Sequence, residues 1–501
     1  MTLRLVTIGD SLTQGFQHGA VRRTSWAFPA MVARALDAPA FRAPDFAGDG
    51  WGGPLLDLEL LLARLSAHAG EKLDLWDVPR ALLSIQHSMS QVEDYWERGG
   101  GAQPASSGPI HHNLGVWGFE VGDALSLSDG VCAKNTPPPC DDWLLQLPEH
   151  AMYRTARRVC NPAQQRALAD LTPIDLAHRL GQEHGIENLL VGLGANNALG
   201  TCVSLKVRPS RSPDLTLLAH ERDCNLWEPS HFASLYRDLA RQLERVSAQR
   251  VFLMTVPHVT IAPVTRGVSP QARASGASEL EAGYYEYYTS FWIWDAHFSP
   301  QRNRYLTRDQ ARRIDSTIDA YNDCIRTEAT RRGWQVIDVC ELLDQLAFRR
   351  SAGQPRYALP AGLIEALRAN PLTQFRVRPD GEILLDTRFF RLPPVAPSGG
   401  EPSTAWKTAY RGGLFGLDGV HPTTVGYGVI AHEVLSAFQK AGVPSADPAR
   451  LDWHAIVAND TLLTEPPALL KSLESTLDAL FAKLPLDALI EKLAGYGAEE
   501  L

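Results

Sequence analysis

Two short motifs at opposite ends of the chain carry the side chains that nucleophilic catalysis requires. Gly9-Asp10-Ser11-Leu12 follows an apolar run near the N-terminus, and Asp418-Gly419-Val420-His421-Pro422 lies far downstream. A serine hydroxyl becomes a useful nucleophile when a base removes its proton, and histidine suits that role near neutral pH. The histidine must in turn be oriented by a carboxylate. The two motifs therefore predict Ser11 as a nucleophile, His421 as its base and Asp418 as the partner of His421.

Two further motifs could stabilise the negative charge that develops during acyl transfer. Asn196 stands in Gly194-Ala195-Asn196-Asn197, and its side-chain amide is a good donor to an oxyanion. Gly118 ends Asn113-Leu114-Gly115-Val116-Trp117-Gly118, where a backbone N–H has no side chain to obstruct it. Gly115 and Gly50 are alternatives for this position. Each motif alone is weak, because serine is a common helix N-cap and Asp-Gly usually marks a turn.

The elements that must position these residues follow from the apolar pattern. Five short apolar runs bounded by turn residues predict buried parallel strands at residues 4–8, 113–116, 188–193, 251–256 and 335–339. Helices are predicted between them at 25–36, 173–184, 230–247 and 307–332. Strands that alternate with helices predict an α/β fold with a parallel sheet covered on both faces. Ser11, Asn196 and Gly118 would then lie at the carboxyl edge of that sheet, where such folds bind ligands.

Three stretches interrupt the alternation and are interpreted as insertions into one domain that spans residues 1–446. They lie at about 39–110, 259–306 and 340–416. The second insertion is rich in aromatic residues, for which packing under a long loop is favoured over substrate contact. Residues 447–501 are predicted to form a helical tail, with a leucine stripe that docks on the body or, less favourably, on a second subunit. The stripe consists of Leu470, Leu473, Leu477, Leu480 and Leu484.

Composition narrows the class of protein. The 501 residues are 45% hydrophobic and carry a formal net charge of −9, which does not indicate a nucleic-acid binder. No apolar run reaches the length of a membrane-spanning helix, and the N-terminus lacks the pattern of a secretory signal, so a cytoplasmic protein is expected. Seven scattered cysteines suit reduced thiols, although Cys132 and Cys140 could pair in an exported protein. No metal-ligand motif is evident, and neither a metal nor an organic cofactor is expected.

Taken together and in this order, the four motifs resemble those of the SGNH (GDSL) hydrolase superfamily. The resemblance implies a flavodoxin-like, three-layer α/β/α sandwich with a five-stranded parallel sheet. It also implies that Ser11 is the nucleophile and supplies the first oxyanion N–H, that Gly118 and Asn196 supply the other donors, and that Asp418 and His421 complete a triad. The run from Gly15 to Ala20 is similar to the usual continuation of the first motif.

The chain departs from the family pattern in its third and second motifs. Asn197 stands where the family usually has aspartate, so a supporting carboxylate is lost while the donor Asn196 is retained. The second motif also lies much farther from the first than in compact members, because the 39–110 insertion separates them.

The resemblance implies an esterase or lipase that cleaves a carboxylic ester of a lipid, an acylated sugar or a small molecule. Two alternatives remain open: an interaction protein that keeps the fold without the reaction, and an acyltransferase that uses the same triad. Dinucleotide binding is disfavoured, because the run that begins at Gly192 has Asn197 where G-x-G-x-x-G requires a small residue.

Overall fold

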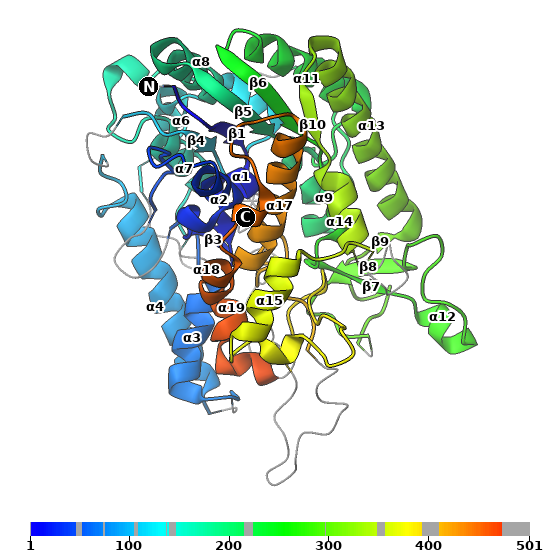
Figure 1. Ribbon diagram of the computed structural model, residues 1–501. Helices are drawn as coiled ribbons and strands as arrows, with labels where there is room; N and C mark the ends of the chain where they lie inside the picture. The colour runs from blue at the N-terminus through cyan, green and yellow to red at the C-terminus, as the bar shows by residue number, and fades with distance from the viewer. Residues whose placement is uncertain are drawn as a thin grey trace.

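A five-stranded, all-parallel sheet lies at the centre of the computed structural model, with helices on both of its faces (Figure 1). The strands follow the spatial order β4-β1-β5-β6-β10. Each predicted strand overlaps one of them, so the predicted α/β fold with a five-stranded parallel sheet is confirmed. Their bounds are β1 Val6–Gly9, β4 Asn113–Gly115, β5 Ile186–Gly192, β6 Ala248–Met254 and β10 Gln335–Ile337.

Numbered along the chain, the strand order is 2-1-3-4-5, that of a doubly wound sheet. In this order the crossovers change direction between β1 and β5, and ligands bind beyond the carboxyl ends of the strands at that point. The segment after β1 contains Ser11, and the segment after β5 contains Asn196. The topology therefore brings the first and third motifs to the same edge of the sheet.

The structure describes residues 2–46, 53–73, 76–104, 109–136, 138–139, 147–214, 224–295, 297–347, 356–392 and 410–472. No helix in these ranges is both long enough and apolar enough to cross a membrane. The described cysteines are free thiols, and Cys140 lies outside the described ranges.

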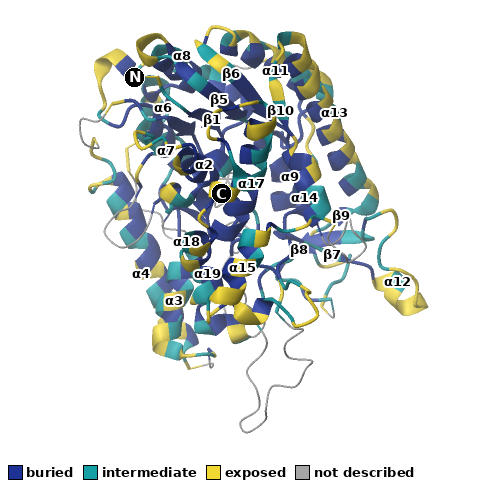
Figure 2. Ribbon diagram, in the orientation of Figure 1, coloured by how far each residue is buried: buried dark blue, intermediate teal, exposed yellow. Residues whose placement is uncertain are grey.

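Two apolar cores cover the two faces of the sheet because successive strand side chains point in opposite directions. Ile8 and Val191 enter one core, whereas Leu190 and Phe252 enter the other. Figure 2 shows the strands and the inner faces of the surrounding helices as buried. The first core is covered by α8 (Pro173–His184), α11 (Pro229–Leu243) and α13 (Arg308–Arg332), and the second by α2 (Phe28–Ala35), α14 (Val339–Leu346) and α17 (Thr424–Lys440).

The predicted helices are present, and local capping explains where the best-predicted ones begin. Thr172 accepts a hydrogen bond from the backbone of Asp175 at the start of α8, and Thr307 does the same for Gln310 at the start of α13. Both pairs form capping boxes, which satisfy backbone donors that a helix start leaves unpaired. Gly333 ends α13 in a left-handed conformation, with φ of +67°.

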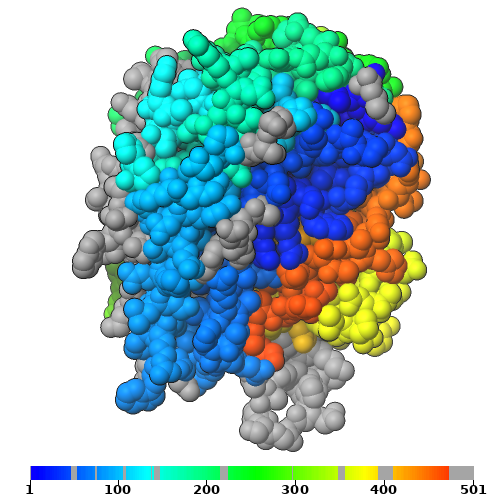
Figure 3. Space-filling model, turned by 90° about the vertical axis from the view of Figure 1, so that its left-hand side faces the viewer, coloured from blue at the N-terminus to red at the C-terminus, as the bar shows by residue number. Residues whose placement is uncertain are grey.

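The 39–110 insertion contains two helices that sequence reasoning did not predict, α3 (Leu58–Ala69) and α4 (Val78–Glu97). Asp57 caps α3 by accepting from the backbone N–H of Leu60 at 2.9 Å. The buried faces of α3 and α4 extend the first core. Figure 3 shows this N-terminal part of the chain lying against the C-terminal residues. There the backbone N–H of Leu469 donates to Ser66 Oγ.

The described part of the predicted tail packs on the body. It contains α18 (Trp453–Ala458) and α19 (Thr461–Thr464), and their apolar residues join the second core. Buried Asp460 accepts from the backbone N–H of Val425 at 2.8 Å and so ties this segment to the first turn of α17. Leu470 is buried against the same core. The other leucines of the predicted stripe lie outside the described residues.

The aromatic insertion at 259–306 folds into a small antiparallel sheet of β7 (Thr265–Val268), β8 (Tyr287–Ser290) and β9 (Leu306–Thr307). Tyr284, Tyr288, Phe291 and Trp294 are buried, as the packing interpretation predicts. The other strands and α-helices of the described ranges are the hairpin β2 (Phe16–Gln17) and β3 (Ala20–Val21), and the helices α1 (Ser11–Gln14), α5 (Val121–Ser126), α6 (Asp129–Lys134), α7 (Ala151–Cys160), α9 (Asn196–Ser204), α12 (Pro270–Ser275) and α15 (Ala361–Ala369).

Candidate active site

Ser11 is the first residue of α1, and only Asp10 separates it from the end of β1. Asp10 caps this helix by accepting from the backbone N–H of Leu12 at 3.0 Å. Gly9 allows the tight turn: a Cβ added there would lie 2.7 Å from the carbonyl oxygen of Gly192 and closer still to the side chain of Thr13. The sharp strand-to-helix turn therefore fixes the position of the Ser11 side chain.

Asp418 and His421 lie in a turn that leads into α17. Asp418 Oδ1 accepts from the backbone N–H groups of Val420 and His421, each at 2.8 Å. Gly419 has φ of +68°, which favours glycine, and its backbone passes so close to Val264 that an added Cβ would lie 2.7 Å from the Val264 nitrogen. The carboxylate and the imidazole are thus placed by the turn itself, as their three-residue spacing predicts.

The three predicted side chains meet in one hydrogen-bonded line. His421 Nε2 lies 2.9 Å from Ser11 Oγ, a contact between residues 410 positions apart in the sequence. His421 Nδ1 lies 3.2 Å from Asp418 Oδ2. All three residues are buried, with Ser11 6% exposed. The ring of Phe16 packs against the imidazole, with 4.5 Å between centroids, and so restricts its orientation.

The charges at this site are set by burial and by His421. Burial pushes the pKa of Asp418 upward, but the charge of His421 and the hydrogen bonds from it outweigh that effect and hold the pKa below its ordinary value. Burial dominates at Asp10 and raises its pKa to about 6, although the backbone hydrogen bond from Leu12 and the charge of His421 oppose the rise. Asp418 therefore remains a carboxylate near neutral pH, ready to stabilise an imidazolium.

The second motif is held beside α1 by backbone contacts. The N–H of Trp117 donates to Gln14 Oε1 at 2.7 Å, and the N–H of Val116 donates to the carbonyl of Gly9 at 3.0 Å. Gly118 follows with φ of +79°. Of the two alternatives to Gly118, the N–H of Gly115 donates to the side chain of Asn113, and Gly50 lies outside the described residues.

The third motif touches the second. Asn196 begins α9, is buried, and donates from its side-chain nitrogen to the carbonyl of Phe119 at 2.8 Å, next to Gly118. This hydrogen bond links the two motifs. Asn197 Oδ1 accepts from the backbone N–H of Val121 at the start of α5. The amide oxygen of Asn197 thus fills the acceptor role that a carboxylate oxygen would fill there.

Two contributors to the site escaped sequence reasoning. The backbone N–H of Gly19 donates to Asp418 Oδ2 at 2.8 Å, so the carboxylate accepts from three backbone N–H groups in addition to its contact with the His421 imidazole. The ring of Phe16 flanks the imidazole. Both residues belong to the run from Gly15 to Ala20 that resembles a family motif. That resemblance was the feature of the sequence that could have identified them as part of the site. Their contacts depend on a chain path that spacing alone does not reveal.

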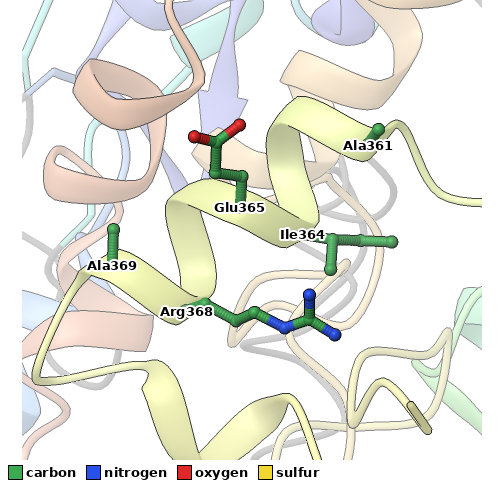
Figure 4. Close-up of a pocket in the computed structure, with 5 residues that line it drawn as sticks. All are labelled: Ala361, Ile364, Glu365, Arg368 and Ala369. Atoms are coloured by element: carbon green, nitrogen blue, oxygen red, sulfur yellow. The ribbon is translucent and has the colours of Figure 1, made fainter.

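Two hollows on the described surface lie apart from these residues. The first, of about 660 Å³, is lined by five residues of α15 (Figure 4). The figure shows Glu365 and Arg368 projecting from that helix in different directions, so they do not converge on a ligand. The second, of about 350 Å³, is lined by residues of α4 and α7 and the loops beside them. Neither lining includes Ser11, Asp418 or His421.

Comparison with protein-family models, with curated proteins and with solved structures finds no match to this chain.

Proposed function

We propose that the chain is a serine hydrolase of the SGNH (GDSL) type, which cleaves a carboxylic ester through an acyl-enzyme on Ser11. The observation that carries the proposal is the line of contacts from Ser11 Oγ to His421 Nε2 and from His421 Nδ1 to Asp418 Oδ2. A structural serine would need only one local hydrogen-bond partner. Here a base and a carboxylate, brought from the far end of the chain, are aligned with a serine at the ligand-binding edge of the sheet.

Proton transfer would begin the reaction. His421 Nε2 takes the proton from Ser11 Oγ as that oxygen attacks the ester carbonyl. Asp418 accepts the Nδ1–H of the resulting imidazolium and stabilises its charge. The lowered pKa of Asp418 supports this role, because the carboxylate stays ionised while His421 gains a proton.

The oxyanion of the tetrahedral intermediate would be held by the backbone N–H groups of Ser11 and Gly118 and by the amide of Asn196. The hydrogen bond from the Asn196 amide to the carbonyl of Phe119 fixes the orientation of that amide. His421 then protonates the leaving alkoxide, and a water molecule repeats the sequence to release the acid. An alcohol in place of that water would give acyl transfer through the same intermediate.

Labelling with a fluorophosphonate tests the proposal, because this probe reacts with an activated serine. Wild type is expected to be labelled and to hydrolyse p-nitrophenyl acetate, whereas Ser11→Ala and His421→Ala should lose both properties. Ser275→Ala is the matched control: this exposed serine bonds only to the carbonyl of Ala272, among the described contacts, and its loss should change neither readout. Unlabelled wild type would favour a protein that keeps the fold without the reaction. Labelling that survives Ser11→Ala would place the nucleophile elsewhere.

A further inference from the structure

A second cluster of reactive side chains lies beyond the carboxyl ends of β6 and β10. His258 follows β6, and Cys340 and Asp344 stand one turn apart on α14, which follows β10. The loops are tied together: the N–H of Thr255 donates to the carbonyl of Ile337, and the N–H of Cys340 donates to Thr255 Oγ1 at 2.9 Å. The parallel pairing of β6 with β10 therefore brings an imidazole, a thiol and a carboxylate to one place.

The ligand atoms of this cluster are spaced as the corners of a tetrahedral metal site require. His258 Nδ1 lies 3.0 Å from each carboxylate oxygen of Asp344 and 3.6 Å from Cys340 Sγ, and one ligand atom from each of the three residues lies within 4.8 Å of the others. Zinc bonds of about 2.0–2.3 Å at tetrahedral angles put neighbouring N and O ligands about 3.3 Å apart and N and S ligands about 3.6 Å apart. Movements of a few tenths of an ångström would complete the geometry.

The other ring nitrogen of the imidazole is held as zinc-binding histidines usually are. His258 Nε2 lies 3.0 Å from Asp319 Oδ1 on α13. A carboxylate at this position fixes the tautomer that leaves Nδ1 as the metal ligand and orients the ring.

Exposure around the cluster gives an ion a route to it. His258 and Cys340 are buried, whereas the side chain of Asp344 is 24% exposed and that of Asp319 is 65% exposed. Three protein ligands with one position facing solvent is the arrangement of zinc sites that keep a water ligand.

We propose that His258 Nδ1, Cys340 Sγ and a carboxylate oxygen of Asp344 bind one Zn²⁺ ion, with Asp319 orienting the histidine. A combination of imidazole, thiolate and carboxylate favours zinc over magnesium or calcium, which prefer oxygen ligands alone. The site uses none of the residues that contact Ser11, and it stands independently of the proposed hydrolase reaction.

Titration of the full chain with Zn²⁺ and Co²⁺, after dialysis against a chelator, tests the site. Wild type is expected to bind one equivalent of Zn²⁺ in calorimetry. With Co²⁺ it should develop a thiolate-to-cobalt charge-transfer band and the visible bands of a tetrahedral ion. Cys340→Ser should lose the charge-transfer band, and Asp319→Asn should weaken binding by about 10–100-fold. Cys324→Ser removes a half-buried thiol on α13 and should leave both titrations unchanged.

Two results would overturn the zinc site: wild type that binds no stoichiometric Zn²⁺, or a cobalt spectrum that Cys340→Ser leaves intact. Circular dichroism of each variant checks folding. If Cys340→Ser does not fold, Asp344→Asn serves in its place: its amide can still hydrogen-bond to His258, and a drop of tenfold or more in Zn²⁺ affinity is expected. Ser11→Ala should bind Zn²⁺ as wild type does, so failure of the hydrolase proposal is distinguishable from failure of the zinc site.

Discussion

Replacement of Asp418 by asparagine exchanges one carboxylate oxygen for an amide nitrogen. It separates the two roles of this side chain, which accepts backbone N–H groups and also contacts the imidazole of His421. Its Oδ1 accepts two backbone N–H groups, while its Oδ2 accepts from Gly19 and contacts His421 Nδ1. The asparagine amide can turn its oxygen toward only one of these pairs. With the oxygen in the Oδ1 position, a single backbone donor, Gly19, loses its acceptor. In the reverse orientation two donors are lost, so the first orientation is favoured.

In that orientation the amide nitrogen faces His421 Nδ1 and donates to it. The imidazole must then carry its proton on Nε2, which points at Ser11 Oγ, and it can no longer accept the serine proton. Loss of the carboxylate from a Ser-His-Asp triad lowers turnover by about ten-thousandfold, or about 5 kcal/mol. The buried Gly19 N–H, left without an acceptor, costs about 1–3 kcal/mol of stability.

The assay is kcat/KM for p-nitrophenyl acetate together with thermal unfolding at several pH values. The folded-state pKa of Asp418 is depressed, so its stabilising effect is present above the unfolded pKa and is lost as pH falls through the folded value. The stability gap between wild type and Asp418→Asn should therefore narrow in acid. Asp452→Asn, which replaces an exposed helix cap, is the control and should retain full activity. If Asp418→Asn loses less than tenfold in kcat/KM, the assigned role of the carboxylate is wrong.

Three further substitutions test the surroundings of Ser11. Asn196→Ala should lower turnover on p-nitrophenyl acetate by about a hundredfold or more, because an oxyanion donor is lost; nearly full activity would contradict that assignment. Gly118→Ala puts a side chain at φ of +79°, which should cost about 1–2 kcal/mol in thermal unfolding. It should also reduce turnover, and unchanged kinetics would remove Gly118 from the site. Burial raises the pKa of Asp10 from 3.8 to about 6, so its stabilising effect is present below the unfolded pKa and is lost as pH rises through about 6. The neutral amide of Asp10→Asn should therefore gain up to about 3 kcal/mol over wild type between about pH 3 and pH 8, and a gap that does not change with pH would refute this reasoning.

The sheet and its main helices were predictable because their signals are local. The strand at 188–193 is a short apolar run bounded by turn residues, and α8 and α13 begin at capping boxes that can be read from the sequence. The helix α4 was missed although its buried positions, among them Ile85, Met89 and Val92, recur at helical spacing. Glycines and prolines flank α4 in the sequence, so the segment was interpreted as part of an insertion and its helical spacing was overlooked.

The candidate site was predictable by residue type but not in its supporting contacts. The three-residue spacing of Asp418 and His421 signalled their pairing, and the topology of a parallel sheet brought them to Ser11. The Gly19 donor and the burial of Asp10 arise from tertiary packing, which no spacing encodes. His258 similarly lies 82 positions before Cys340, and only the pairing of β6 with β10 joins them.

The central claim is an acyl-enzyme on Ser11, and rapid quenching followed by peptide mass spectrometry tests it most directly. Wild type mixed with p-nitrophenyl acetate and quenched in acid within the first turnover should carry one acetyl group on the peptide that contains Ser11. The same peptide from Asp418→Asn should acquire it far more slowly. An acetyl group on any other residue, or none while p-nitrophenol is released, would contradict the account.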